Sequence, residues 1–261
     1  MLLRIPAIFL TAALLAFGPS AVRAEDDQSL SPKQQDAVKK LIHDYILENP
    51  SVVADALDAL REKEALAAES AGKRALTEKR EEILNDPDSP ALGAPKSDVT
   101  LVEFFDYRDP YCRAMSDWVF DLVTEKRIRL VLKEWPLLGP ESVVAAKAAI
   151  AVYLQEKAAI AVFQTPKLYT DFHKALMHQK GPLTRSVILK LAADMKLDRK
   201  QLEKEMDEPK VDEIVRKNLS LAHALAANAA PILILNGQMY TGPINKEALT
   251  KLIDDARKPK D

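Results

Sequence analysis

The chain contains a single cysteine, Cys112, and the residues just before it suit the start of a helix. Asp109 suits the N-cap of a helix, because its carboxylate can accept a hydrogen bond from a free amide of the first turn. Pro110 suits the first helical position, where its missing N–H would have no partner within the helix. A thiol attacks a disulfide only as the thiolate, and one cysteine cannot form a disulfide within its own chain. Thiol exchange by a single chain is therefore limited to monothiol chemistry.

The elements that position this thiol are predicted to be a buried strand and the helix that follows it. Residues 99–105 are rich in β-branched and aromatic side chains, which is typical of a strand inside a sheet. In the helix, Cys112, Met115 and Val119 recur at helical spacing and form one apolar stripe. Cys112 is therefore expected to face the core. A buried thiol is usually an inert small hydrophobe, and a reactive monothiol is the alternative.

Metal binding is a further alternative for the same helix. The candidate ligands are Asp109, Cys112 and a nearby group. Cys112 and Met115 place two soft ligands one turn apart, which suits Cu(I), although core packing explains Met115 better. We therefore assign no metal ligands. The histidines show no spacing typical of a metal site or a catalytic triad, and we interpret them as surface or helix-flank residues: His43, His173, His178 and His223.

Two charged residues interrupt segments that are otherwise apolar. Glu103 lies in the strand predicted over residues 99–105, and Lys133 ends the strand predicted over residues 128–133. Burying a lone charge is costly. Each of the two is therefore expected to be paired.

Composition and the first residues indicate an exported globular protein. The 261 residues are 48% hydrophobic with a formal net charge of −2, whereas a nucleic-acid binder normally carries a basic excess on one face. Arg4, the apolar run 5–17 and the small residues ending at Ala24 predict a secretory signal peptide over residues 1–24. An uncleaved anchor is the alternative, but the run is shorter than the roughly 20 residues that a spanning helix needs. Export would bring Cys112 into an oxidising compartment.

A helical region is predicted over residues 25–86. Ser31 and Gln34 form a capping box at the start of a first helix, and a second helix follows from Ser51. Both carry apolar stripes with little to cover them, so we expect self-association. Packing against the following domain and a solvated helical spacer are the alternatives. Residues 87–98 contain three prolines and a glycine and are predicted to be a linker.

The remainder predicts an α/β fold with a mixed sheet. Asn236-Gly237 is the strongest short-range signal for a two-residue hairpin turn, here between strands 232–235 and 238–241. A final helix is expected over residues 246–256. Helical patterns between the early strands and this hairpin cover residues 141–155, 167–179, 184–195, 199–206 and 210–227.

Residues 99–257 resemble the DsbA-like branch of the thioredoxin superfamily, the exported thiol–disulfide oxidoreductases. With the N-terminal helices included, the chain resembles the ScsC-type (suppressor of copper sensitivity) proteins. The resemblance rests on residues 102–113, 133–142 and 172–183 and on Ala230-Pro231. It implies a thioredoxin-like fold with a helical insertion at about 140–228, preceded by an N-terminal helical arm.

The resemblance also implies a site. The family has Cys-x-x-Cys at a helix N-terminus facing a cis-proline, and its first cysteine is the nucleophile. In this chain Asp109 occupies the place of that cysteine, Cys112 that of the second, and Pro231 that of the cis-proline. Glu103 matches the acidic residue in the strand beneath. The implied substrate-binding residues are Pro110, Tyr111 and Ala230.

The function implied is that of an exported, periplasmic thiol–disulfide oxidoreductase family protein, without a cofactor, that acts on or binds other exported proteins. Asp109 removes the nucleophile, so at most monothiol chemistry through Cys112 remains. The alternative is a redox-inactive peptide-binding, chaperone-like or copper-handling scaffold. In either case we expect a homo-oligomer formed through the N-terminal helices, with a trimer as one candidate stoichiometry.

Overall fold

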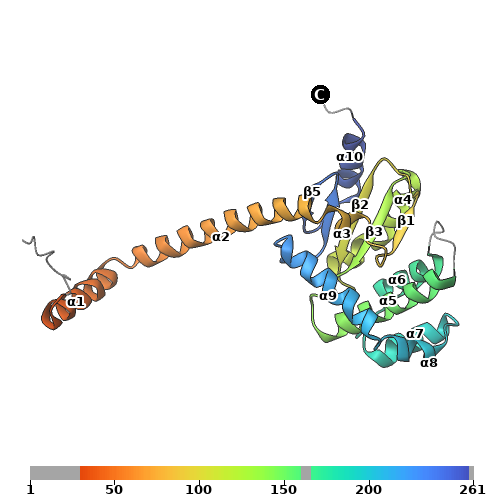
Figure 1. Ribbon diagram of the computed structural model, residues 1–261, viewed down its shortest axis with the longest axis horizontal. Coiled ribbons are helices and arrows are strands. Elements are labelled where there is room, and N and C mark those ends of the chain that lie inside the picture. The colour runs from red at the N-terminus through yellow and green to blue at the C-terminus, as the bar shows by residue number, and fades with distance from the viewer. Residues whose placement is uncertain (1–29, 160–165, 259–261) are drawn as a thin grey trace, which may run out of the picture. The chain divides into compact units, whose positions relative to one another are not determined.

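The structure of the protein is a computed structural model that describes residues 30–159 and 166–258 (Figure 1). The predicted signal peptide, residues 1–24, lies outside the described residues. The chain divides into two compact units, Met1–Ala59 and Leu60–Asp261. This division differs from the predicted boundary between residues 86 and 87.

The first unit contains helix α1 (Pro32–Glu48) and the start of helix α2 (Ser51–Glu78). The Ser31 hydroxyl accepts a hydrogen bond from the Gln34 amide, and the Gln34 side chain bonds back to the Ser31 amide. This is the predicted capping box. No residue of α1 is buried within the chain, so its apolar stripe is exposed.

The second unit is built on a five-stranded mixed sheet with the order β1-β3-β2-β4-β5 (Figure 1). The strands are β1 (Ala91–Gly93), β2 (Thr100–Phe105), β3 (Arg129–Glu134), β4 (Ile232–Leu235) and β5 (Gln238–Thr241). Strand β2 lies at the centre, parallel to β3 and antiparallel to β4. The β4–β5 hairpin turns at Asn236 and Gly237, both with positive φ, as the sequence predicts.

Helices cover the sheet and form the insertion. Helix α4 (Pro110–Glu125) follows β2, and helix α10 (Lys246–Ala256) contacts α4 and β4. The insertion between β3 and β4 contains α5 (Pro140–Ala159), α6 (Lys167–His178), α7 (Arg185–Asp194), α8 (Arg199–Glu205) and α9 (Pro209–Ala224). Helix α5 packs against the other four, and α6 also contacts α4. The thioredoxin-like fold with a helical insertion is therefore confirmed.

The segment predicted to be a linker is part of the second unit. Within residues 87–98, strand β1 pairs antiparallel with β3 and buries Leu92. The unit also includes the end of α2 and helix α3 (Arg80–Leu84). At Gly72 an added Cβ would lie 2.8 Å from the Leu225 backbone oxygen, so this close approach requires glycine.

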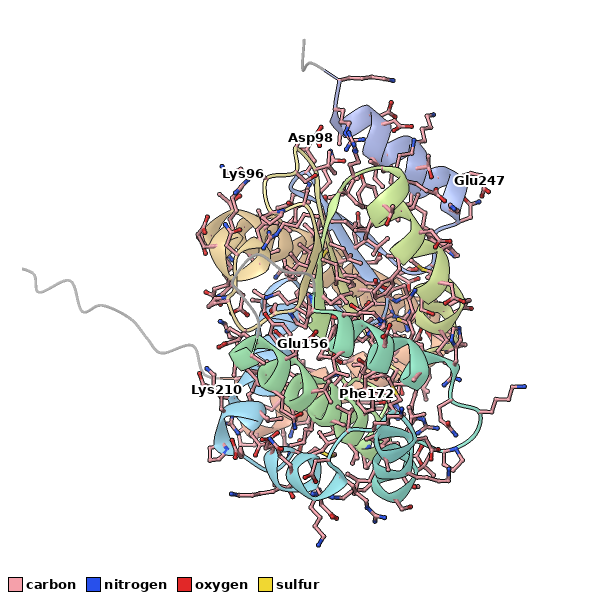
Figure 2. All side chains as sticks on the ribbon, turned by 90° about the vertical axis from the view of Figure 1, so that its right-hand side faces the viewer. Lys96, Asp98, Glu156, Phe172, Lys210 and Glu247 are labelled. Carbon is pink, nitrogen blue, oxygen red and sulfur yellow. The ribbon has the colours of Figure 1, made fainter. Side chains whose placement is uncertain are left out.

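The ends of the second unit are held by ion pairs between segments distant in sequence. Figure 2 shows Asp98 at the same end of the unit as α10. Asp98 binds Arg257 through two hydrogen bonds of 2.8 and 3.0 Å, a fork that fixes the chain before β2 against the C-terminal helix.

Candidate functional site: the N-terminus of helix α4

Asp109 is the N-cap of α4. Its Oδ1 accepts hydrogen bonds from the backbone amides of Tyr111, at 2.9 Å, and Cys112, at 2.8 Å. Its carboxylate is almost buried and lies at the positive end of the helix dipole, an arrangement worth about 1 kcal/mol. The Asp109 side chain is therefore occupied with holding the first turn of the helix.

Cys112 is fully buried on the inner face of α4, as the stripe of apolar residues predicts. Burial raises the pKa of the thiol well above its ordinary value, and the charge of Glu103, once that carboxyl is ionised, and the charge of Asp109 raise it further. Thiolate is the reactive form of cysteine, so this environment disfavours both access to the sulfur and its ionisation.

Glu103 lies on β2 with its carboxyl buried. The expectation that it is paired is wrong: among the described residues no hydrogen bond or ion pair to its side chain is found. Burial raises the pKa of Glu103 to about 8, so the carboxyl holds a proton at neutral pH. Glu103 thus avoids the cost of an unpaired buried charge because its carboxyl is protonated, and no ion pair is needed.

Lys133 is paired as expected, but on the other face of the sheet. Phe104 is its partner in the β2–β3 register, whereas Glu103 is opposite Leu132, and neighbouring residues of a strand point to opposite faces. Lys133 Nζ lies 3.0 Å from Asp86 Oδ2, with both side chains fully buried. The two charges that interrupt the strands therefore belong to separate environments.

The Ala230–Pro231 peptide bond is cis, and both residues are buried. They directly precede Ile232, which is opposite Phe104 in the antiparallel β2–β4 pair. This register places Ala230 and Pro231 at the end of the sheet where β2 leads into α4. The topology therefore brings Asp109, Cys112 and Pro231 to one end of the sheet.

Three exposed apolar or aromatic side chains lie at the start of α4 and in the loop after β3. Tyr111, Leu137 and Leu138 are 53%, 39% and 43% exposed. The buried Asp106 carboxylate accepts hydrogen bonds from the amides of Leu137 and Leu138, at 2.7 and 2.8 Å, which fixes residues 137–138 beside the end of β2. The sequence analysis did not single out Asp106. An aspartate directly after a buried strand was the available signal.

The sequence analysis also missed a buried polar cluster under this end of the sheet. Its members are Tyr107, Glu134, Tyr169, His173 and Asn218. The assignment of all four histidines to surface or helix-flank positions is wrong for His173, which is 2% exposed. The available signal was its place with Tyr169 and Leu176 on one helical stripe.

The described residues contain no group of three His, Cys, Asp or Glu side chains arranged to hold a metal ion. Met115 is buried in the core beside Cys112, as its helical spacing predicts. Among the described helices, none is both long enough and apolar enough to cross a membrane.

Two families match the chain. The family described as thioredoxin matches residues 85–255, and the one described as the copper resistance protein ScsC N-terminal domain matches residues 34–67. The fold and these matches define a thioredoxin-like protein with an ScsC-type N-terminal region. The chain belongs to the thioredoxin family, in its DsbA- and ScsC-type group of thiol–disulfide oxidoreductases.

Individual relatives agree with this assignment. A thioredoxin-like oxidoreductase from Silicibacter pomeroyi DSS-3 is 37% identical, with a TM-score of 0.62 over 69% of this chain and 99% of that chain. A variant of Proteus mirabilis ScsC is 20% identical, which shows the fold alone, with a TM-score of 0.63 over 88% and 98%. The probable disulfide bond formation protein D of Bacillus anthracis is 25% identical over 172 residues, 63% of this chain and 76% of that protein.

Proposed function

We propose that the protein is an exported member of this oxidoreductase family that binds segments of other exported proteins without completing a dithiol exchange cycle. The observation that carries the proposal is the pair of hydrogen bonds from the α4 amides to Asp109, at the position of the family's nucleophile. A dithiol cycle needs one thiolate to attack and a second thiol to resolve the mixed disulfide. A carboxylate can do neither.

Burial of the remaining thiol supports binding over monothiol exchange. Cys112 is fully buried, and its pKa is raised by burial first and by Glu103 second. Exchange through Cys112 would require the first turn of α4 to open and the thiol to ionise beside two carboxyl groups. We therefore assign Cys112 a packing role.

The proposed binding surface consists of the exposed Pro110 and Tyr111, bordered by Leu137 and Leu138, with the buried cis segment Ala230-Pro231 at the same end of the sheet. Exposed aromatic and aliphatic side chains on rigid supports are typical of surfaces that bind peptides. Here Asp109 supports Tyr111, and Asp106 supports the two leucines. The surface is therefore held in place although its redox centre lacks the nucleophile.

Export to the periplasm and self-association complete the proposal. Residues 1–24 have the pattern of a cleaved signal peptide, which supports export. Helices α1 and α2 expose an apolar set that would be covered in a homo-oligomer, with a trimer as one candidate stoichiometry: Val38, Leu41, Ile42, Tyr45, Ile46, Val53 and Leu57.

Thiol labelling tests the redox part of the proposal. A maleimide reagent is expected to label Cys112 of the native protein at least 100-fold more slowly than that of the protein in guanidinium chloride. Cys112→Ser serves as the blank. Rapid labelling of the native protein would favour monothiol chemistry instead.

Peptide binding tests the other part. An unfolded, cysteine-free polypeptide carrying a fluorescent label is expected to bind the wild type, with anisotropy as the readout. Tyr111→Ser and Leu138→Ser should each weaken binding several-fold, because each removes exposed apolar contact area. Lys180→Ser, at an exposed residue of the insertion, is the matched control. Equal binding by all three variants would refute the assigned surface.

A further inference from the structure

The five residues of the buried polar cluster join the sheet to the insertion. Tyr107 follows β2, Glu134 ends β3, Tyr169 and His173 lie on α6, and Asn218 lies on α9. Each is at most 2% exposed. Tyr107 lies within one loop of the candidate site, residues 106–109, and Glu134 directly precedes the other, residues 135–138.

Glu134 is the centre of the cluster. Its Oε1 accepts hydrogen bonds from the hydroxyls of Tyr107, at 2.9 Å, and Tyr169, at 2.8 Å. The Tyr107 hydroxyl also lies 3.1 Å from His173 Nδ1. Glu134 Oε2 is buried and has no hydrogen-bond partner among the described residues. An ionised carboxylate would leave this oxygen charged and unpaired, whereas a protonated carboxyl carries no charge.

Among the described residues, no positively charged side chain hydrogen-bonds to the Glu134 carboxyl. His173 is neutral, because burial lowers its pKa to about 3. Asp106 and Glu103, on the β2 side, are acids and bring no positive charge. Glu156 of α5, labelled in Figure 2, accepts hydrogen bonds from the amides of Leu168 and Tyr169 at the start of α6. Cys112 of α4 is protonated. On α9, Asn218 donates to the Glu134 backbone oxygen, and Lys217 binds Asp86 on the opposite face.

These surroundings favour the neutral acid. Burial raises the pKa of Glu134 to about 8; the hydrogen bonds from Tyr169 and Tyr107 oppose the rise, and the charge of Asp106 adds to it. The pKa values of both tyrosines are raised well above 10, first by burial, so their hydroxyls keep their protons in this range.

The cluster is covalently continuous with both loops. Tyr107 lies between Asp106 and the Arg108-Asp109 pair, and Glu134 is followed by residues 135–138. Asp106 binds the amides of Leu137 and Leu138. The two loops are thus tied together twice, by Asp106 within them and by the hydrogen bond between Tyr107 and Glu134 below them.

We propose that the hydrogen bond from Tyr107 to the neutral carboxyl of Glu134 holds residues 106–109 and 135–138 together, and that ionisation of this carboxyl in mildly alkaline solution loosens both loops, because its unpaired oxygen would then carry a buried charge. The proton leaves to solvent base, and the unpaired oxygen then carries a charge that the cluster must rearrange to solvate. This device goes beyond the proposed function and does not depend on peptide binding.

Trp135 provides the test in the full-length protein. It is buried next to Glu134 and packs edge-on against Phe104, with ring centroids 6.4 Å apart. The chain has two tryptophans, so Trp118→Phe leaves Trp135 as the only one. Its emission is expected to change between pH 7 and 10 with a midpoint near pH 8. Adding Glu134→Gln should abolish the transition, whereas Glu103→Gln, at the other buried carboxyl with a raised pKa, should preserve it.

A second variant keeps the test decisive if Glu134→Gln does not fold. Tyr169→Phe removes a hydrogen bond that favours the ionised form, so the midpoint should rise. The proposal is overturned by a parent protein without a transition, by a transition that survives Glu134→Gln, or by a midpoint that Tyr169→Phe leaves unchanged or lowers.

Discussion

The backbone amide of Cys112 donates a 2.8 Å hydrogen bond to Asp109 Oδ1, so the residue that caps α4 is bonded directly to the residue that carries the thiol. The same oxygen accepts the Tyr111 amide. A single carboxylate therefore stabilises the first turn of α4 and holds Cys112 inside it. Under the proposed function, the binding surface keeps its supports while the exchange chemistry lacks its first thiol.

Asp109→Cys should restore disulfide chemistry. The new thiol would stand at the positive end of α4 with Cys112 as resolving thiol, and reduction of insulin disulfides by dithiothreitol should become faster than the uncatalysed reaction. Loss of the cap should lower the free energy of unfolding by about 1 kcal/mol.

Two controls separate chemistry from structure in this experiment. Asp109→Ser keeps a capping oxygen and should stay inactive, and so should Asp109→Cys combined with Cys112→Ser. An inactive but folded Asp109→Cys protein would mean that the site differs from a working one at more than this residue.

Glu103 should make the protein less stable as pH rises from about 4.5 to about 8. Burial raises its pKa from 4.5 to about 8, so in this window the folded protein keeps a proton that the unfolded chain releases. Stability from this group is full below pH 4.5 and is lost toward pH 8, at up to about 1.4 kcal/mol per pH unit. Glu103→Gln should flatten this decline in urea unfolding curves at pH 5, 6, 7 and 8.

The pKa of Glu134 is also raised, so its ionisation lowers stability over the same pH range. The decline of stability with pH should therefore be smaller in Glu103→Gln but still present. Thr100→Ser, at a partly exposed position of the same strand, should keep the parent slope. If the free energy of unfolding of Glu103→Gln falls with pH as steeply as that of the parent protein, the Glu103 carboxyl is already ionised in the folded protein.

Asp86→Asn should destabilise the protein strongly. Asp86 binds the fully buried Lys133 at 3.0 Å and Lys217 at 2.8 Å. Although burial opposes it, the hydrogen bonds and charges of these lysines lower the pKa of Asp86 to about 2. Removing its charge leaves Lys133 buried without a counter-ion, which typically costs about 3–5 kcal/mol in the free energy of unfolding.

Asp88→Asn is the matched control for the same measurement. Asp88 also binds two lysines, Lys157 and Lys210, but all three side chains are partly exposed. Its loss should cost about 1 kcal/mol or less. Similar costs for the two variants would contradict the distinction between a buried and a solvated ion pair. Replacing Lys133 by Met in the Asp86→Asn protein should recover part of the loss.

Ile42→Glu should reduce the molecular mass in solution, measured by light scattering. Ile42 is an exposed apolar residue of the α1 stripe, and a charge there would oppose burial against another copy of the helix. Lys40→Glu, at an exposed charged position of the same helix, should leave the mass unchanged. A monomeric parent, or equal masses for all three proteins, would refute self-association through this helix.

Several features followed from the sequence because their causes are local. A capping box needs only Ser31 and Gln34, a tight hairpin needs only Asn236 and Gly237 with positive φ, and Asp109 with Pro110 defines the start of α4. The apolar spacing around Cys112 likewise predicts its burial. These interactions join residues within one turn, so no knowledge of the rest of the fold was required.

Other features were decided by the tertiary structure. Residues 91–93 form a strand because β3 offers a partner edge, and Gly72 is required because Leu225 approaches it. Glu103 and Lys133 both interrupt apolar strands, but the register turns them to opposite faces, where only Lys133 meets a counter-ion. His173 is buried because α6 packs over the ends of β2 and β3. In each case the partner lies far away in sequence, so spacing along the chain could not reveal it.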